Sequence, residues 1–199
     1  MANNNAPFGL RPVGNMASGN YPGKVTQYSV PSSDGTAIYV GDPVKLVGTS
    51  QFINGQTYAD VAQAATGDVI VGVVVGTAAD TRDSLLYRAA STQRVLYVCD
   101  DPNAVFEAQQ VSTGTALTAN DVGLNVNFVV AAGSTVTGLS GTTLDNTTEA
   151  TTNTLDLKIV GMVNRADVDP GTAVATGAAS SRFLVRINRH QYVNQIAGV

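Results

Sequence analysis

The chain has 199 residues and a formal net charge of −4 at pH 7, with 13% charged and 44% hydrophobic residues. The negative charge argues against sequence-independent binding to nucleic acid, which requires a basic surface. A single cysteine, Cys99, excludes an internal disulfide. The longest apolar run, residues 69–75, is too short to cross a bilayer as a helix. We therefore expect a soluble protein with neither nucleic-acid nor membrane partners.

The first 23 residues are rich in Pro, Gly and Asn, a composition that cannot form a useful helix. They also carry Phe8, Leu10 and Val13, which a fully disordered tail would lack. We expect an extended arm over residues 1–23 that becomes ordered when its apolar side chains find a groove. A frayed terminus is the alternative. Nothing at the start resembles a signal peptide, so we expect synthesis in the cytoplasm.

The stretch 94–110 is the one around which the rest of the chain is organised. Residues 95–99 are apolar or amphipathic, which predicts a strand buried on both faces. Asp101-Pro102-Asn103 then favours a turn. Residues 104–109 alternate, with Phe106 on one face and Glu107 on the other, which predicts a half-buried strand returning beside the first. The prediction is a central hairpin.

Short apolar or alternating segments indicate further strands along the rest of the chain. Thr, Val, Ala, Gly and Asn are abundant while Glu and Lys are scarce, and this favours strands and turns over long helices. The segments predicted as strands are 24–30, 37–40, 44–47, 69–75, 125–130, 155–163 and 182–187.

The intervening segments are predicted as loops with little helix. Residues 48–67 are expected to be a loop with hairpin character at Asn54-Gly55. Residues 78–90 are the one plausible helix, although a strand through 85–87 fits nearly as well. Residues 118–123 suggest a single helical turn. We also expect an exposed Thr/Ser-rich loop or hairpin over 134–154, and a loop around Asp169-Pro170-Gly171 within 164–181.

The expected fold class is mainly β. We predict a single compact antiparallel β-sandwich or barrel-like body over residues 24–199, with the extended N-terminal arm and few short helices.

Residue types that support catalysis are scarce. A Ser-His-Asp or Cys-His arrangement would need the only histidine, His190, whose neighbours are basic or amidic, so we expect an exposed or interface histidine. Asp100 and Asp101 are adjacent and point to opposite faces of a strand, which suits metal binding poorly. One His and one Cys exclude a tetrahedral zinc site, whereas a Ca²⁺ site stays open. We expect no catalytic residue, cofactor or metal, and a protein that is not an enzyme.

Charge is distributed unevenly along the chain. Residues 1–33 contain Arg11 and Lys24 without an acid, and residues 182–190 contain several cations without an acid. Two basic ends therefore flank an acidic middle.

Five blocks of sequence span nearly the whole chain in order, and they are Ala2–Gly14, Val40–Val44, Tyr97–Gln109, Asp121–Phe128 and Val185–Tyr192. Together they resemble a group of tailed-bacteriophage virion proteins, the capsid decoration or cement proteins.

The resemblance implies a small β-rich body, usually a homotrimer, on the outside of the head at local threefold positions. Such a protein clamps neighbouring major capsid proteins and stabilises the shell. An arm with apolar anchors can add to a neighbour's sheet or groove, and basic ends can meet an acidic capsid surface. The residues expected at the interface with the capsid or a sister subunit are Phe8, Leu10, Arg11, Val13, Arg182, Arg186, Arg189 and His190.

Two other functions compete with this hypothesis. A phage tail or neck component, or a host-binding adhesin, would also use an exposed loop on a β-rich body. A β-fold hydrolase acting on cell-surface polysaccharide would need a cleft with two facing carboxylates.

Overall fold

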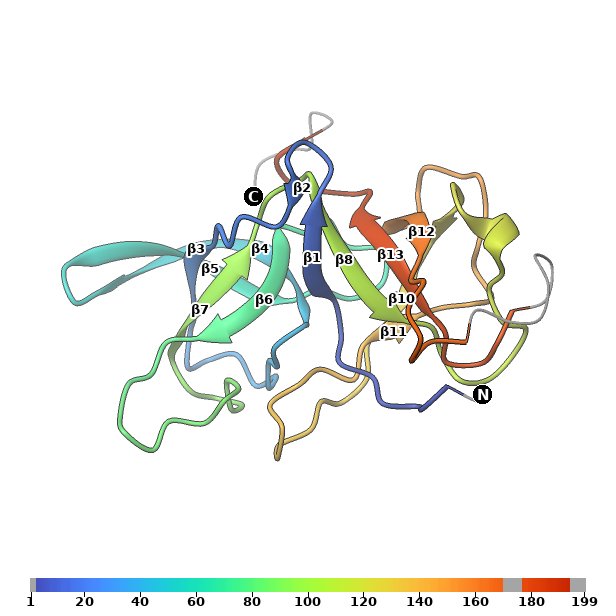
Figure 1. Ribbon diagram of the computed structural model, residues 1–199. Coiled ribbons are helices and arrows are strands. Elements are labelled where there is room, and N and C mark those ends of the chain that lie inside the picture. The colour runs from blue at the N-terminus through green and yellow to red at the C-terminus, as the bar shows by residue number, and fades with distance from the viewer. Residues whose placement is uncertain (1–2, 170–176, 194–199) are drawn as a thin grey trace.

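The computed structural model describes residues 3–169 and 177–193, and strands make up almost all of its regular structure (Figure 1). They form a closed five-stranded barrel, a six-stranded sheet and a small two-stranded sheet. The predicted mainly β class is confirmed. Within the described residues the only helical element is η1 (Ala119–Asp121), a 3-10 turn that confirms the helical turn predicted over 118–123.

The barrel is built from one continuous part of the chain. Its strand order is β3-β5-β4-β6-β7, and the β3–β5 pair is parallel while the other pairs are antiparallel. The strands are β3 (Thr26–Val30), β4 (Pro43–Ile53), β5 (Gln56–Gln63), β6 (Gly72–Thr77) and β7 (Arg94–Cys99).

The six-stranded sheet combines the N-terminal segment with the C-terminal half of the chain. Its order is β2-β1-β8-β13-β12-β9, and all its pairs are antiparallel. Its strands are β1 (Arg11–Asn15), β2 (Gly19–Asn20), β8 (Ala104–Gln109), β9 (Asn125–Val126), β12 (Leu157–Met162) and β13 (Arg182–Ile187); the separate two-stranded sheet pairs β10 (Phe128–Val129) with β11 (Thr143–Leu144).

Two hydrophobic cores hold this body together. One lies among the barrel strands and includes Val74 and Leu96, while the other joins barrel strands to the six-stranded sheet and includes Val73, Cys99 and Phe106. Successive residues of a strand point to opposite faces, so β6 contributes to both cores. This double burial explains the Val-rich run at 69–75 and confirms its predicted buried position.

The predicted central hairpin is wrong, although both of its strands exist. β7 pairs with β3 and β6 of the barrel, whereas β8 pairs with β1 and β13 of the six-stranded sheet. Between them Asp101 caps the predicted turn, accepting a 2.8 Å hydrogen bond from the backbone N–H of Asn103. The turn therefore carries the chain from one sheet to the other. Alternation identifies a strand, but the strand's partner depends on distant segments.

The N-terminal segment is integrated into the body rather than forming a free arm ahead of residue 24. β1 pairs with β8 in a register that sets Arg11 opposite Glu107, and Leu10 is only 2% exposed. Gly9 has φ +73° and lies so close to Gly41 that an added Cβ would meet the Gly41 carbonyl oxygen at 2.4 Å. Glycine at this position allows the segment to pack against the barrel.

Two other segments differ from their predictions. Most of the 48–67 loop is instead the β4–β5 hairpin, and its predicted turn is confirmed, because Asn54 and Gly55 both have positive φ values (50° and 84°). The helix predicted over 78–90 is wrong. There, Arg88 is fully buried and donates hydrogen bonds to four backbone carbonyls, which holds the segment in an irregular path.

The middle of the 134–154 segment is buried, contrary to the exposed loop expected there. Ser140, Thr142 and Asn146 are at most 2% exposed. The carboxylate of Asp42, also buried, accepts hydrogen bonds from Ser140 Oγ (2.5 Å) and Thr142 Oγ1 (3.3 Å). Polar composition alone does not reveal such an internal partner.

The remaining predicted strands are found with small changes. Segments 24–30, 155–163 and 182–187 become β3, β12 and β13, and 125–130 divides into β9 and β10. Segment 44–47 lies within the longer β4, whereas 37–40 makes only isolated bridges at Ile38 and Val40. Part of the loop predicted over 164–181, including Pro170 and Gly171 of its turn, lies outside the described residues.

Candidate interface on the six-stranded sheet

The solvent-facing side of the six-stranded sheet gathers cations from distant parts of the chain. On β13, Phe183, Val185 and Ile187 are buried, so Arg182 and Arg186 point to the other side, as predicted. The β12–β13 register sets Lys158 beside Arg186, and the β8–β13 and β1–β8 registers set Glu107 between Leu184 and Arg11.

Glu107 is the centre of this surface. Although the residue is only 1% exposed, its carboxylate lies 2.7 Å from Arg11 Nη2, 2.8 Å from Arg165 Nη2 and 3.5 Å from Arg182 Nη1. Burial by itself would raise the pKa of Glu107, but hydrogen bonds from Arg165 and Arg11 outweigh it and keep the pKa below its ordinary value. Glu107 is therefore held as a carboxylate that fixes three arginines.

The arginines are only partly neutralised. Asp167 accepts from Arg165 Nε at 3.1 Å and lies 3.5 Å from Arg182 Nη1. With Arg186 and Lys158 included, the ion pairs and registers of residues 3–169 and 177–193 set five cations against two carboxylates on this face, on a chain whose net charge is −4. The side chains of Arg11 and Arg165 are 52% and 42% exposed, so their guanidinium groups remain accessible.

Phe8 connects the arginines to the rest of the N-terminal segment. The guanidinium carbons of Arg11 and Arg182 lie 4.8 Å and 5.3 Å from the centre of its ring. Both distances allow a cation–π attraction, which helps to orient the two side chains.

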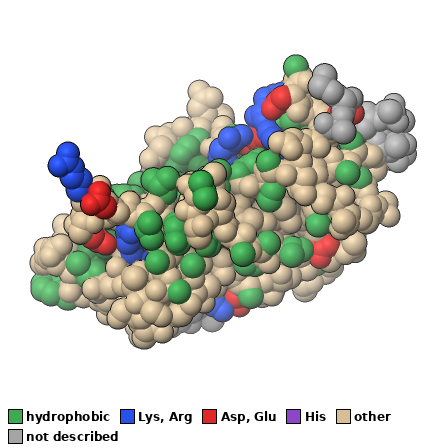
Figure 2. All heavy atoms as spheres, turned by 90° about the horizontal axis from the view of Figure 1, so that it is seen from below, with side chains coloured by type: hydrophobic (Ala, Val, Ile, Leu, Met, Phe, Trp, Pro, Cys, Tyr) green, Lys and Arg blue, Asp and Glu red, His purple; other side chains and the backbone are tan. Residues whose placement is uncertain are grey.

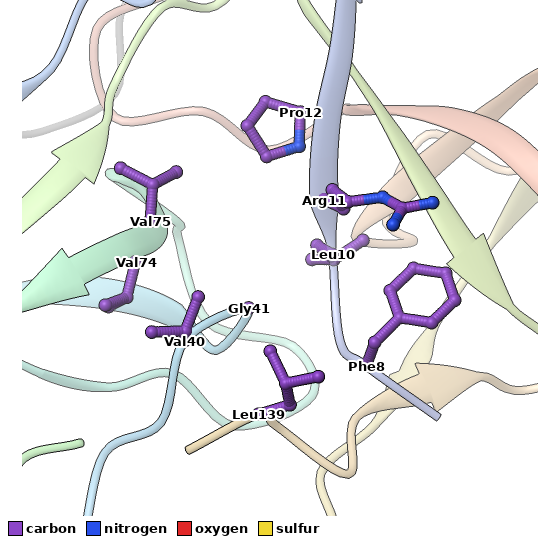
Figure 3. Close-up of a pocket in the computed structure, with 9 residues that line it drawn as sticks. All are labelled: Phe8, Leu10, Arg11, Pro12, Val40, Gly41, Val74, Val75 and Leu139. Atoms are coloured by element: carbon purple, nitrogen blue, oxygen red, sulfur yellow. The ribbon is translucent and has the colours of Figure 1, made fainter. Parts of the chain in front are cut away.

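An apolar groove of about 300 Å³ lies beside this cluster (Figure 3). Leu139, at its edge, is 38% exposed, and Leu85 and Leu86 of the nearby 78–90 segment are 47% and 65% exposed. Hydrophobic side chains are gathered on the face seen from below in Figure 2. The groove is lined by Phe8, Leu10, Arg11, Pro12, Val40, Gly41, Val74, Val75 and Leu139.

Most of the residues expected at an interface lie on or beside this surface. Phe8, Arg11 and Arg182 are brought together, Arg186 lies on the same face further along β13, and Val13 of β1 is 42% exposed. Phe8 and Val13 were predicted from their apolar side chains in a polar segment. The arginines were predicted because basic residues gather at the two ends of the chain.

Three of the expected residues are used differently. Leu10 is a core residue. Arg189 donates to the carbonyl of Gly67 and lies 3.6 Å from the buried carboxylate of Asp156. His190 is fully buried, so its expected exposure is wrong; its Nδ1 accepts from the N–H of Tyr192, and burial lowers its pKa.

Sequence reasoning missed Glu107, Arg165 and Lys158 as members of the surface. Glu107 had a weak signal, since it is one of only two glutamates and alternates with buried Phe106. No pattern in the sequence indicated Arg165, because it follows β12 in a segment predicted as a loop.

Other titratable groups are held apart by separate partners. Asp100 accepts from the Tyr28 hydroxyl at 3.1 Å, and Asp101 accepts from Asn15 Nδ2 at 2.7 Å. Cys99 is a buried free thiol whose pKa is raised by burial. Across residues 3–169 and 177–193, no three His, Cys, Asp or Glu side chains are grouped so as to hold a metal ion. Nor does that part of the chain contain a helix long and apolar enough to span a membrane.

Fold and surface together define an all-β protein with a basic sheet face beside an apolar groove. Comparison with known proteins finds no matching family model, no similar curated protein and no similar solved structure.

Proposed function

We propose that this chain is a structural virion protein that decorates the outside of a phage head and is not an enzyme. Its partners would be the major capsid protein and further copies of itself, with a homotrimer as the expected assembly. The observation that carries the proposal is the convergence of Arg11, Arg165 and Arg182 on one exposed sheet face of an acidic chain. The sequence resemblance supports the same role.

The geometry of the basic face suits an acidic protein surface. Arginine presents several donors in a planar fork that matches carboxylates. Glu107 and Phe8 hold two of these forks in place, which lowers the entropy that docking would cost. Charge complementarity of this kind sets register and association rate more than raw affinity.

Stabilisation of the head would follow from mass action. A protein that binds the assembled shell, and not its separated subunits, adds its binding free energy to the stability of the shell. The apolar groove beside Phe8 offers a place for an uncharged side chain of the capsid, which would add burial to the charge contacts.

The copy number in purified virions tests this proposal directly. Quantitative mass spectrometry should give a simple fraction of the number of major capsid proteins. A handful of copies per particle would move the protein to the tail or neck, and complete absence from virions would overturn both structural roles.

Reversing charge on the basic face tests the docking surface. Arg186→Glu avoids the Glu107 cluster and should weaken binding to heads that lack the protein by about tenfold, with reduced salt dependence. The matched control is Arg82→Glu, the same change at an exposed residue of the 78–90 segment. Equal binding by the two variants would remove the sheet face from the proposal.

A further inference from the structure

The distal half of the β4–β5 hairpin extends away from the barrel (Figure 1). β4 and β5 pair as far as Ile53 and Gln56. In contrast, β6 pairs with β4 only at Pro43 and Val44, and β3 pairs with β5 only at Asp60. Within the described part of the chain, the outer edge of β4 beyond Val44 therefore has no neighbouring strand.

The register shows which backbone groups this edge presents. Ile53 and Gln56 flank the two-residue Asn54-Gly55 turn and so form the hydrogen-bonded pair that closes the hairpin. Hydrogen-bonded and non-hydrogen-bonded pairs alternate along an antiparallel ladder. Phe52 and Ser50 therefore point their N–H and C=O groups away from β5, toward the open edge.

Charged residues and prolines, which often protect an open edge, are missing from the distal half of this hairpin, although the β4–β5 register shifts between Leu46 and Ser50. Residues 46–59 contain no Lys, Arg, Asp, Glu or Pro. Phe52 is 75% exposed. Charged residues and prolines are the usual means by which proteins prevent edge-to-edge pairing, and a bare two-stranded hairpin is only marginally stable in water. An uncharged projecting hairpin is therefore suited to pairing with another strand.

We propose that the open edge of β4 pairs with the hairpin of a second copy of this chain. Charge favours this partner, because an uncharged strand can lie against its own copy without the like-charge repulsion expected between other surfaces of a −4 chain. The distal half of the hairpin, residues 46–59, also offers no cation to an acidic partner, unlike the six-stranded sheet. Backbone pairing would supply affinity, and Phe52 would be buried at the contact.

The inference deepens the self-association included in the proposed function, and it is tested on the purified full-length protein alone. Sedimentation velocity over a range of concentrations should show association of the wild type. Hydrogen exchange measured by mass spectrometry should show protection of residues 46–53 that falls on dilution. Copy number in virions is independent of both measurements, so the two proposals can fail separately.

Two variants probe the edge in different ways. Ser50→Pro removes an outward N–H without removing a bond to β5, and Phe52→Lys places a charge on an exposed side chain. Each should weaken association at least about tenfold while circular dichroism shows an unchanged fold. Val136→Lys is the matched control, because Val136 is an 87% exposed apolar residue in another segment.

Three results would overturn the inference. They are a wild type that stays monomeric throughout the concentration range, edge variants that associate as tightly as Val136→Lys, and protection of residues 46–53 that does not change on dilution.

Discussion

The β4–β5 hairpin and the 134–146 segment place their Ser and Thr residues in opposite environments. Both contain Ser, Thr and Gly, and neither residues 48–67 nor residues 134–154 were expected to lie in the core. Thr49, Ser50 and Phe52 of the hairpin are exposed, whereas Ser140 and Thr142 are fully buried. Polar composition therefore does not decide whether a segment is buried.

The difference comes from where each segment finds a carboxylate. Asp60 belongs to the hairpin and accepts hydrogen bonds from Thr49 and Gln51 on the facing strand and from Ser29 of the neighbouring barrel strand β3. Asp42 lies about 100 residues from Ser140 and Thr142 in sequence and holds them against the barrel. A distant buried acceptor brings a polar segment into the interior, because its donors must be satisfied there.

Removing the two carboxylates should separate the regions most clearly. Asp42→Ala leaves the donors of Ser140, Thr142, Gln63 and the Tyr39 N–H without their acceptor inside the protein, and should lower the free energy of unfolding by about 4 kcal/mol. Asp60→Ala should cost about 2 kcal/mol, since the buried Ser29 hydroxyl keeps the Tyr58 carbonyl as an acceptor and Thr49 is exposed and can bind water. Urea unfolding measures both, and equal losses would contradict the comparison.

Glycine substitutions provide a second contrast of intermediate size. Gly138 has φ +72°, and an added Cβ would lie 2.7 Å from Leu86 Cβ, whereas Gly55 has φ +84° with nothing within 4 Å. We expect Gly138→Ala to cost about 2 to 3 kcal/mol through strain and crowding, and Gly55→Ala about 1 kcal/mol through strain alone. Thermal unfolding should rank them in this order, and the reverse order would show that the 134–146 segment is loosely packed.

The smallest expected effect is the pH dependence that Asp42 gives to the free energy of unfolding. Burial raises the pKa of Asp42 despite the hydrogen bonds from Ser140 and the Tyr39 N–H, so the folded state favours the protonated form relative to the unfolded state. The resulting stability is fully present below the ordinary value of 3.8 and is lost as pH rises through the folded pKa. The stability of the wild type relative to Asp42→Asn should therefore decline as pH rises above 3.8. A difference that grows with pH in urea titrations would contradict this assignment.

Strand positions were largely predictable, whereas strand partners were not. Alternation located β8 and β13, and a continuous Val-rich run located β6, because burial imposes these patterns locally. Nothing local shows that β8 pairs with β1 instead of β7, since that pairing joins residues 89 to 96 apart in sequence.

The residues of the candidate interface were likewise only partly predictable from the sequence. Arg11 and Arg182 were identified because basic residues gather at the two ends of the chain. Arg165 and Glu107 were missed, since only the assembled sheet brings them beside those residues. His190 was misjudged because its polar neighbours in sequence are not its neighbours in space.

The order of the strands has a consequence for synthesis on the ribosome. All five barrel strands are complete once residue 99 has been made, but β1, which is made first, has to wait for β8. At 5–20 residues per second, the interval between residues 15 and 104 is roughly 4 to 18 s. The nascent chain can thus close its barrel while β1 is still unpaired, and the six-stranded sheet is assembled last although it includes β1, which is made before every barrel strand.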